Sequence, residues 1–321
     1  MTDEQKPLFN RSTMAMYPPG SLFKPFVALI AQQEGVLNPD RTIPCSGAHF
    51  FKGQRLLGCH EHPTCFNVAS AIQHSCNNYF VTVYRETIDQ FGQTSPVAGL
   101  DTFNTYLERF GMGQKLGLDF PGEKAGFYPS SDFFSNVVYK DEIAWYSIWL
   151  RSLGIGQGEL LATNLQLANM AAILANRGWY YPPHLLKEYR YNVKPIDKKY
   201  QTKIETGIRP EFFEPVIDGM EQVVTSGTAR LAYISDIPVC GKTGTAENSG
   251  EDHSIFFAFA PKENPKIAIV TYVENAGFGG SVAAPIASLL IEKYIKGEIR
   301  GPQRQYLEKM ILEKDLRATL P

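Results

Sequence analysis

The chain has 321 residues, which is enough for one large domain or two modest ones with a full core. Its net charge of -2 and hydrophobic content of 44% exclude intrinsic disorder and offer no basic field that would attract nucleic acid. No apolar run approaches the length of a membrane span, and the polar N-terminus lacks the apolar core of a signal peptide. We therefore expect a soluble chain, either by itself or as the soluble part of an anchored protein.

Residues 1–20 are predicted to be a polar tail that ends in a Pro-Pro-Gly turn. At Ser21 an apolar run with helical spacing begins, which predicts a helix from Ser21 to about Gln33 with Lys24 one turn from its start. Residues 36–66 show no clear period and contain three cysteines and three histidines. A loop this long inside a compact domain is usually functional or tied down by other groups.

The middle of the chain is predicted to be mainly helical. Helices are expected at 67–73, along the apolar stripe from Phe80 to Phe91, at 103–110 after a loop at 92–99, and from a capping box at Thr163 to Gly178. Residues 111–162 are rich in turns and include Gly-Ile-Gly-Gln-Gly at 154–158, which we interpret as a structural turn.

The last third of the chain has a different pattern. After short strands and loops at 179–209 comes an amphipathic helix at 211–224, and we interpret Gly227-Thr228 beyond it as structural. Strands are then predicted at 237–246, 254–260 and 266–274, followed by a helix at 282–295 and a polar tail at 301–321. Helices in the middle followed by an antiparallel sheet predict the α+β class rather than βαβ repeats.

Three short motifs carry the chemistry. They are Ser21-x-x-Lys24 at the start of a helix, Ser75-x-Asn77 between two helices, and Lys242-Thr243-Gly244 on a strand. A serine hydroxyl is a poor nucleophile until a base takes its proton, and a lysine can do so when burial or another cation lowers its pKa. Each motif is common by chance, but the three in this order and on these elements indicate acyl transfer.

The set resembles the serine acyltransferases of the penicillin-binding protein and β-lactamase superfamily. The flanking residues, in Tyr-Pro-Pro-Gly-Ser-x-x-Lys-Pro, Ser-Cys-Asn and Gly-Lys-Thr-Gly-Thr-Ala, make it most similar to class B penicillin-binding proteins of the elongation-specific penicillin-binding protein 2 group. The resemblance implies a transpeptidase domain at 21–300, with a helical subdomain at about 36–170 and a sheet subdomain at about 179–297. Residues 1–20 would then be the truncated start of the domain.

Acyl transfer also assigns roles to the motif residues. Ser21 is the expected nucleophile and Lys24 its expected base, although the identity of that base is disputed in this superfamily. Ser75 and Asn77 are expected to face the cleft while Cys76 points away, so that Ser75 relays a proton to the leaving amine and Asn77 holds a substrate amide. Lys242 is expected to be a fixed cation that lowers the pKa of Lys24 and attracts a carboxylate.

The residues after Lys242 are expected to bind substrate. The hydroxyls of Thr243 and Thr245 can bind a carboxylate, and Gly244 lets the substrate approach the edge of the strand. In the family that the chain resembles, the backbone N–H groups of Ser21 and Thr245 form the oxyanion hole.

The resemblance implies a peptidoglycan D,D-transpeptidase that acts through a serine acyl-enzyme and is inhibited covalently by β-lactams. A D,D-carboxypeptidase and a β-lactam-binding sensor or scaffold remain alternatives. The implied partners are a stem peptide on a lipid-linked precursor, a glycosyltransferase and other elongation proteins, without nucleic acid. The implied location of the full-length protein is the periplasmic face of the inner membrane, and no cofactor is expected for catalysis.

Four of the five cysteines, Cys45, Cys59, Cys65 and Cys76, lie close together in the first quarter of the chain. Four thiolates can hold one tetrahedral structural Zn²⁺, with His60 and His62 as alternative ligands. Some Gram-negative members of the resembled group carry a structural zinc in this region. Disulfides and free thiols remain alternatives, because sequence alone does not fix how cysteines pair.

The chain departs from the family at its start. Members of the superfamily have strands before the Ser-x-x-Lys helix that join the terminal sheet, but only 20 residues precede Ser21 here. We therefore expect either a fragment or a sheet with fewer strands and an exposed edge.

Overall fold

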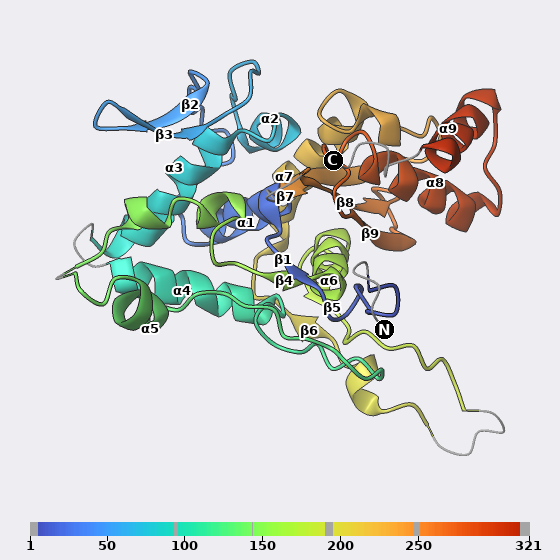
Figure 1. The fold of residues 1–321 in the computed structure, drawn as a ribbon, viewed down its shortest axis with the longest axis horizontal. Coiled ribbons are helices and arrows are strands. Elements are labelled where there is room, and N and C mark those ends of the chain that lie inside the picture. Colours follow the sequence, from blue (N-terminus) through green and yellow to red (C-terminus); the bar gives the residue numbers. More distant parts are fainter. Residues whose placement is uncertain (1–5, 93–95, 143, 190–194, 247–250, 315–321) are drawn as a thin grey trace.

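The computed structural model describes residues 6–92, 96–142, 144–189, 195–246 and 251–314 (Figure 1). The predicted tails at 1–20 and 301–321 and the predicted loop at 92–99 each extend partly outside these described residues.

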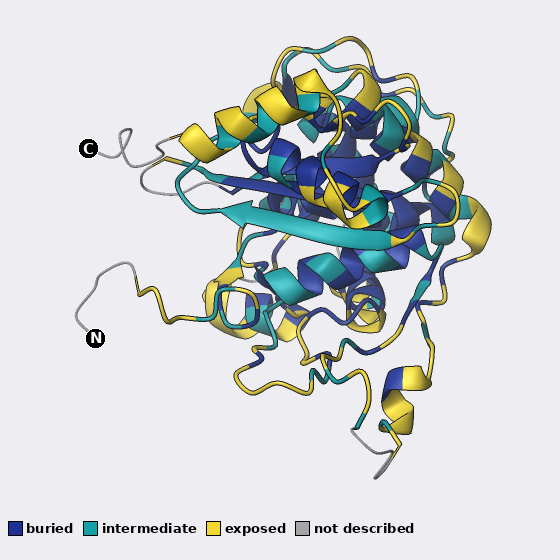
Figure 2. Cartoon of the chain, turned by 90° about the vertical axis from the view of Figure 1, so that its right-hand side faces the viewer, coloured by how far each residue is buried: buried dark blue, intermediate teal, exposed yellow. Residues whose placement is uncertain are grey.

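The main sheet has three antiparallel strands in the order β7-β8-β9. They are β7 (Cys240–Ala246), β8 (His253–Ala260) and β9 (Ile267–Val273), which confirms the three strands predicted at the end of the chain. The first strand begins at Cys240 rather than at residue 237, because Pro238 has no N–H to give to the ladder. Seven of the eight residues of β8 are buried, since α8 (Ala283–Lys296) packs on one face of the sheet and α6 (Asn164–Ala175) on the other (Figures 1 and 2).

Helices and small two-stranded sheets make up the rest of the structure. The remaining helices are α1 (Lys24–Gln33), α2 (Val68–Gln73), α3 (Asn77–Ile88), α4 (Pro96–Arg109), α5 (Ser131–Phe133), α7 (Phe213–Thr225) and α9 (Pro302–Glu313). The small sheets pair β1 (Met16–Tyr17) with β4 (Ala162–Thr163), β2 (Ala48–Phe51) with β3 (Gln54–Gly58), and β5 (Trp179–Tyr180) with β6 (Ile204–Glu205). In Figure 1, α3, α4 and the β2–β3 hairpin lie on the left, and the main sheet with α8 and α9 lies on the right.

Helix α1 runs through the centre of the molecule, and nine of its ten residues are buried. It packs against α3 of the helical part and reaches α7, which itself packs along β7 and α2. The start of α1 is therefore held where the helical part meets the sheet. Helix α6 contacts β8 and β9, although the sequence places it at the end of the helical subdomain.

The predicted capping box at the start of α6 is confirmed. The side chain of Thr163 accepts a hydrogen bond from the N–H of Gln166, and the side chain of Gln166 accepts one from the N–H of Thr163. The buried amide of Gln166 also donates to the carbonyls of Gly111, Gln114 and Ala125. One side chain thus fixes both the start of α6 and the turn-rich segment that precedes it.

Two of the predicted irregular segments are wrong in part. The predicted loop at 36–66 contains the β2–β3 hairpin, whose turn has positive φ at both Lys52 and Gly53. The predicted loop at 92–99 ends early, because α4 already begins at Pro96. Gly99 lies within α4, and a glycine is needed there because a Cβ would collide with the backbone of Ile88 at the end of α3.

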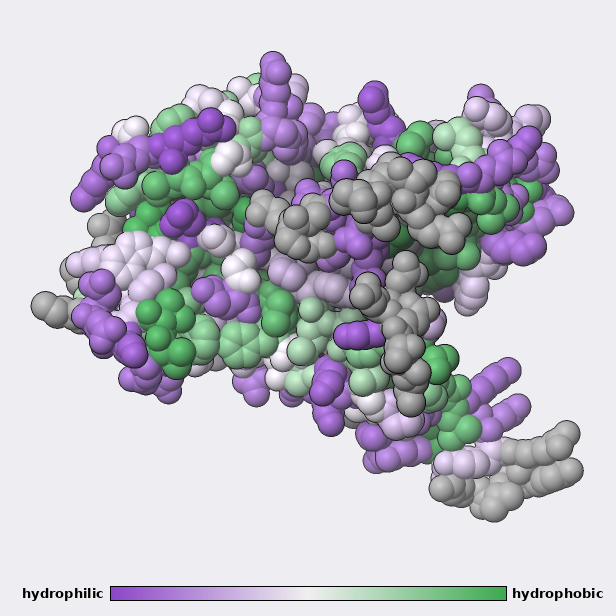
Figure 3. Space-filling view, in the orientation of Figure 1, coloured by the Kyte–Doolittle hydropathy of each residue, from purple (hydrophilic) through white to green (hydrophobic). Residues whose placement is uncertain are grey.

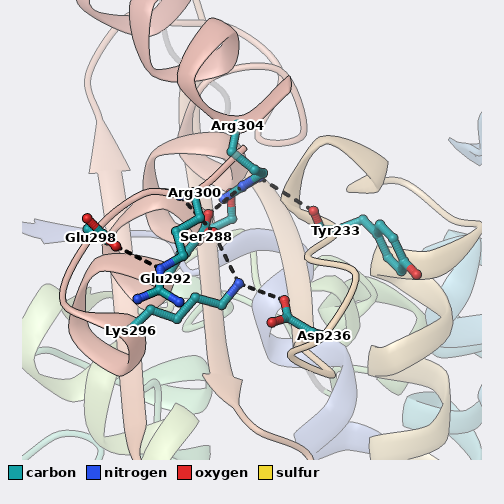
Figure 4. A network of polar contacts seen from close by, with 8 residues as sticks. All are labelled: Tyr233, Asp236, Ser288, Glu292, Lys296, Glu298, Arg300 and Arg304. Atoms are coloured by element: carbon teal, nitrogen blue, oxygen red, sulfur yellow. Dashed lines mark hydrogen bonds and ion pairs between the residues drawn. The ribbon is translucent and has the colours of Figure 1, made fainter. Parts of the chain in front are cut away.

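The polar tail predicted at 301–321 is also wrong in part, because its described residues include α9. The α9 helix is held to α8 through Glu292 of α8, whose side chain is buried with 1% exposed (Figure 4). Its carboxylate accepts hydrogen bonds from Arg304 Nε at 2.7 Å and from Lys296 Nζ at 3.2 Å. Arg304 also donates to Ser288 Oγ at 3.0 Å, so one arginine of α9 is anchored twice on α8.

In the described part of the chain, no helix has the length and apolar character needed to cross a bilayer. Figure 3 shows apolar patches between charged side chains on one face of the molecule, including the region of α4 and α5. Single exposed apolar residues such as Val137 and Leu312 are common on protein surfaces and indicate no site by themselves.

We predict that Glu292→Gln lowers the free energy of unfolding by about 2 kcal/mol or more, because it leaves the largely buried Arg304 without a carboxylate and leaves Lys296 paired with Asp236 alone. Glu298→Gln is the matched control, since Glu298 and its partner Arg300 are both 63% exposed. We expect that control to change the free energy of unfolding by less than about 0.5 kcal/mol. Urea denaturation of both variants tests this, and equal unfolding midpoints would contradict it.

Candidate active site

Ser21 lies in a tight turn between the sheet and the helical part. It belongs to a 3-10 helix, η1 (Gly20–Phe23), and α1 begins only at Lys24, so the predicted helix starts with a different geometry. Gly20 has φ +55°, and a Cβ there would lie 2.7 Å from the carbonyl oxygen of Thr245. The N–H of Gly20 donates to the carbonyl of Gly156 at 2.8 Å. The backbone before Ser21 is thus pressed between β7 and the predicted 154–158 turn.

Lys24 is completely buried and directs its Nζ toward the Ser75-x-Asn77 motif. Its Nζ donates to the carbonyl oxygen of Ser75 at 2.6 Å, to Ser75 Oγ at 3.1 Å and to Asn77 Oδ1 at 2.6 Å. Burial lowers the pKa of Lys24 to about 8, because the ammonium form loses hydration. The side chain therefore has a substantial neutral population slightly above neutral pH.

Ser75 Oγ lies between the two lysines of the site. It accepts hydrogen bonds from Lys24 Nζ at 3.1 Å and from Lys242 Nζ at 2.8 Å. A hydroxyl has two acceptor lone pairs and one proton, so the proton of Ser75 is left to donate elsewhere. Ser75 also has φ +53°, an uncommon backbone conformation for a residue with a Cβ.

Lys242 is completely buried as well, and burial together with the nearby Lys24 ammonium lowers its pKa. The sequence predicts Lys242 to be a fixed cation that lowers the pKa of Lys24. Burial is the main cause of the lowered pKa of each lysine, and because repulsion between like charges is reciprocal, each ammonium also disfavours the charged form of the other. The two ammonium groups titrate as a pair.

Asn77 connects the lysine site to the loop before α2. It is the first residue of α3, and its side-chain amide donates to the carbonyl of Gly58 at 2.8 Å. Its backbone N–H donates to Cys59 Sγ at 3.2 Å. Asn77 is therefore fixed from behind by residues 58 and 59 while its Oδ1 accepts from Lys24.

Strand β7 supplies the opposite wall of the cleft. Thr243 and Thr245 line the cavity, with Thr243 3% exposed. Gly244, which is predicted to let the substrate approach the strand edge, also has a packing role, since a Cβ there would lie 3.0 Å from Leu22 Cγ and 3.2 Å from the carbonyl of Pro19. Its missing side chain lets η1 pack on β7, which brings the serine close to the two threonines.

Together these side chains surround a cavity of about 560 Å³. Its lining includes Ser21, Ser75, Asn77, Thr243 and Thr245 from the predicted set, and also Leu57, Gly58, His60, Ile155, Gln157, Thr228, Asp252 and Phe278. Of the second group, Leu57 and Gly58 end β3, and Ile155 and Gln157 belong to the 154–158 turn, which the sequence predicts only as structural. The sequence likewise marks His60 only as an alternative metal ligand and Thr228 only as structural, because no motif records that these segments meet at the cleft.

A cluster of sulfur and imidazole groups lies behind Asn77. Cys45, Cys59, His62 and Cys76 offer ligand atoms that all lie within 4.8 Å of one another. Cys59 Sγ is 3.9 Å from Cys76 Sγ and 3.3 Å from His62 Nε2. Hydrogen bonding to Cys76 and burial raise the pKa of Cys59 to about 12. All five cysteines of the chain are free thiols in this structure, so no disulfide links these groups.

The cluster differs from the predicted four-cysteine set at one position. His62 takes the place of Cys65 among the mutually close ligand atoms. The sulfur of Cys65 lies at the edge of the cluster, 3.8 Å from His62 Nδ1 and 3.9 Å from the carbonyl oxygen of Ser70 in α2. The bridge between Cys65 and Ile43 holds the backbone of Cys65 in that position. His60, the other predicted alternative, lines the cleft that contains Ser21 instead.

Residues 1–292 match the family model described as the penicillin binding protein transpeptidase domain. The chain belongs to this family, and both the predicted resemblance and the predicted α+β transpeptidase fold are confirmed.

Within the family, the chain is similar to the peptidoglycan D,D-transpeptidase MrdA of Acinetobacter baumannii, with 30% identity over 93% of this chain and 45% of that protein. It is also similar to Pseudomonas aeruginosa PBP2 in complex with WCK 5153, at 32% identity and a TM-score of 0.78, covering 94% of this chain and 64% of that one. A third similar structure is the complex of PBP2 and MreC from Helicobacter pylori, at 25% identity and a TM-score of 0.75, covering 92% and 53% of the two chains. The chain thus spans about half the length of the curated relatives that it matches.

We predict that acylation by a penicillin accelerates as the pH rises from about 6 to about 8 and then levels off. The sign follows from the lowered pKa of Lys24, since only the neutral amine can accept the proton of Ser21. Stopped-flow acylation rates across this range measure the effect. Lys24→Arg is the control, because a guanidinium stays charged throughout and should be slow at every pH. A rate in the parent protein that does not change between pH 6 and 8 would exclude Lys24 as the titrating base.

Proposed function

We propose that this chain is the catalytic domain of a peptidoglycan D,D-transpeptidase. The observation that carries the proposal is the hydrogen-bonded series Lys24, Ser75 and Lys242, whose middle member Ser75 lines one cleft together with Ser21 and the β7 threonines. The MrdA relatives are named for the same activity. The substrate class is a stem peptide that ends in D-alanyl-D-alanine.

In the first half of the proposed reaction, Ser21 Oγ attacks the carbonyl carbon between the two D-alanines, and neutral Lys24 takes its proton. The N–H groups of Ser21 and Thr245 stabilise the oxyanion. When the C–N bond breaks, the leaving D-alanine amine receives the proton that Ser75 donates, and Lys24 returns a proton to Ser75 over the 3.1 Å contact. Thr243, Thr245 and the charge of Lys242 bind the terminal carboxylate.

In the second half, an amine of a neighbouring stem peptide attacks the ester carbonyl. Ser75 and Lys24 take up the amine proton, Ser21 Oγ leaves and is reprotonated, and a new amide bond results. Transfer of the same acyl group to water gives the carboxypeptidase alternative. A β-lactam-binding sensor would be acylated at Ser21 without any peptide transfer. A β-lactam acylates the same serine because its carbonyl and carboxylate occupy the same two subsites.

We place the full-length protein at the periplasmic face of the inner membrane, where lipid-linked peptidoglycan precursors are available. Its proposed partners are a glycosyltransferase that supplies the glycan strand and other proteins of the elongation machinery. The Helicobacter pylori structure pairs PBP2 with MreC, which supports a partner of that kind.

We also propose that the cluster behind Asn77 holds one structural Zn²⁺ through Cys45, Cys59, Cys76 and His62. A tetrahedral site with Zn–S distances of about 2.3 Å needs sulfur atoms about 3.8 Å apart, close to the 3.9 Å between Cys59 and Cys76. The Nδ1–H of His62 donates to the carbonyl of Pro63 at 2.6 Å, which leaves Nε2 free to bind a metal. A four-ligand site leaves no position for a reactive water, so the zinc would be structural and take no part in the acyl transfer.

For the central proposal, we expect a fluorescent penicillin to form a stable covalent adduct with the parent chain and none with Ser21→Ala. The hydroxyl of Ser21 is the group that forms the ester, so its removal should abolish labelling while the fold persists. Gel fluorescence with mass spectrometry of the labelled peptide measures this. Labelling that survives in Ser21→Ala would refute the assignment. Incubation with a stem-peptide pair and analysis of products separates transfer to an amine from hydrolysis and from acylation alone.

For the metal, we expect about one zinc per purified chain by elemental analysis, because three thiols and one imidazole form a complete tetrahedral set. His62→Ala should lose the metal. Cys65→Ala should keep it, because Cys65 lies outside the set of mutually close groups. Loss of zinc in Cys65→Ala but not in His62→Ala would favour the four-cysteine set. Absence of zinc together with disulfides detected by mass spectrometry would refute the site.

A further inference from the structure

Thr228 lies in the wall of the cleft and contacts a residue that binds substrate in the proposed function. Its Oγ1 is 2.8 Å from Oγ1 of Thr243 across the junction between the segment after α7 and strand β7. It lines the same cavity as Ser21, Ser75 and Thr245. The contact joins two hydroxyls, either of which can donate.

The backbone on both sides of Thr228 is closely packed, which fixes the position from which its side chain extends. A Cβ at Gly227 would lie 2.7 Å from the carbonyl of Gln73 at the end of α2. The N–H of Ala229 donates to the carbonyl of Val223 in α7 at 2.9 Å. On the other side, a Cβ at Gly280 would collide with the carbonyl of Thr228. Helices α2 and α7 and the 278–280 turn thus fix the side chain against β7.

The direction of this hydrogen bond follows from the ligand. A carboxylate can only accept hydrogen bonds, so a carboxylate beside Thr243 must accept one from the Thr243 hydroxyl. The oxygen of Thr243 is then left as an acceptor, and the hydroxyl of Thr228 is fixed where it can donate to it. Donation from Thr228 also polarises the second hydroxyl and strengthens its bond to the carboxylate.

We propose that Thr228 is a positioning residue that orients the Thr243 hydroxyl toward the terminal carboxylate of the substrate. It thereby raises the preference of the cleft for acyl donors with a free carboxylate over those without one. This inference rests on the proposed acyl transfer at Ser21, and it adds a residue that acts through Thr243.

The test compares the second-order acylation rate constants of a penicillin and of its methyl ester, which keeps the ring and loses the charge. Thr228→Val keeps the shape of the side chain and removes the hydroxyl. We expect the rate for the acid to fall about fivefold and the rate for the ester to change little, because a net hydrogen bond of ordinary strength is lost. Thr228→Ser should restore the preference for the acid. The matched control is Thr225→Val, an exposed threonine on α7 that should change neither rate.

A second measurement separates positioning from packing. In a double-mutant cycle, adding Thr228→Val to Thr243→Val should cost little more than Thr243→Val alone, because the first residue acts through the second. Equal losses for acid and ester in Thr228→Val, or an unchanged acid-to-ester ratio, would overturn the inference while Ser21 acylation stands.

If the parent chain is not acylated at all, the proposed function fails, and the inference is then tested by binding. Calorimetry with an acylated D-alanyl-D-alanine dipeptide and its C-terminal amide measures the same preference without any reaction. Tighter binding of the acid in the parent and loss of that preference in Thr228→Val would support the inference. An equal preference in both proteins would overturn it.

Discussion

The structure depends on two lysine side chains that are buried beside one serine hydroxyl. Moving an ammonium group out of water is costly, and two like charges at the same place increase the cost. The site meets this cost with acceptors, since Lys24 donates to three oxygens of Ser75 and Asn77 and Lys242 donates to two oxygens of Ser75 and Thr243. The remaining penalty appears as lowered pKa values for both lysines, which is the property that a general base near neutral pH requires. Burial of the two lysines therefore costs folding free energy and at the same time gives Lys24 the lowered pKa that a general base needs.

Bringing these groups together requires three stretches of backbone to approach more closely than side chains allow. Gly20 lies against the carbonyl of Thr245, Gly156 against the backbone of Gly20, and Gly244 against Leu22 and Pro19. A Cβ would collide at Gly20 and at Gly156 and would be tightly packed at Gly244, so the turn with Ser21 is fixed relative to β7 before any substrate arrives. Preorganised donors near a nucleophile lower the barrier without reorganisation during the reaction. In the proposed reaction the glycines would therefore contribute by holding the reacting groups close together, although none of them carries a functional group.

The proposed catalytic residues could be picked out from the sequence because each lies in a short motif whose chemistry is local, as Ser21 and Lys24 do on one helical turn. The strands β7 to β9 could be predicted because their apolar runs are long and clearly bounded. The α9 helix could not, since Pro302–Glu313 buries no residue of its own and is held to α8 by the ion pair of Arg304 with Glu292 and its hydrogen bond to Ser288. The choice of His62 over Cys65, and the place of Thr228, depend on how distant segments pack, and no local pattern records that.

Asn77 links the thiol cluster to the proposed acyl-transfer site through two hydrogen bonds. Its Oδ1 accepts from Lys24, and its N–H donates to Cys59 Sγ, so a change at the sulfur reaches the lysine through one residue. A thiolate is a stronger acceptor than a thiol, and a bound cation keeps the sulfur deprotonated. Zinc at this position would therefore tighten the hold on Asn77 and, through it, on the buried ammonium. Because His60 lies between Cys59 and His62 in the sequence and lines the cleft, the loop that would bind the metal also forms part of the wall that a substrate would meet.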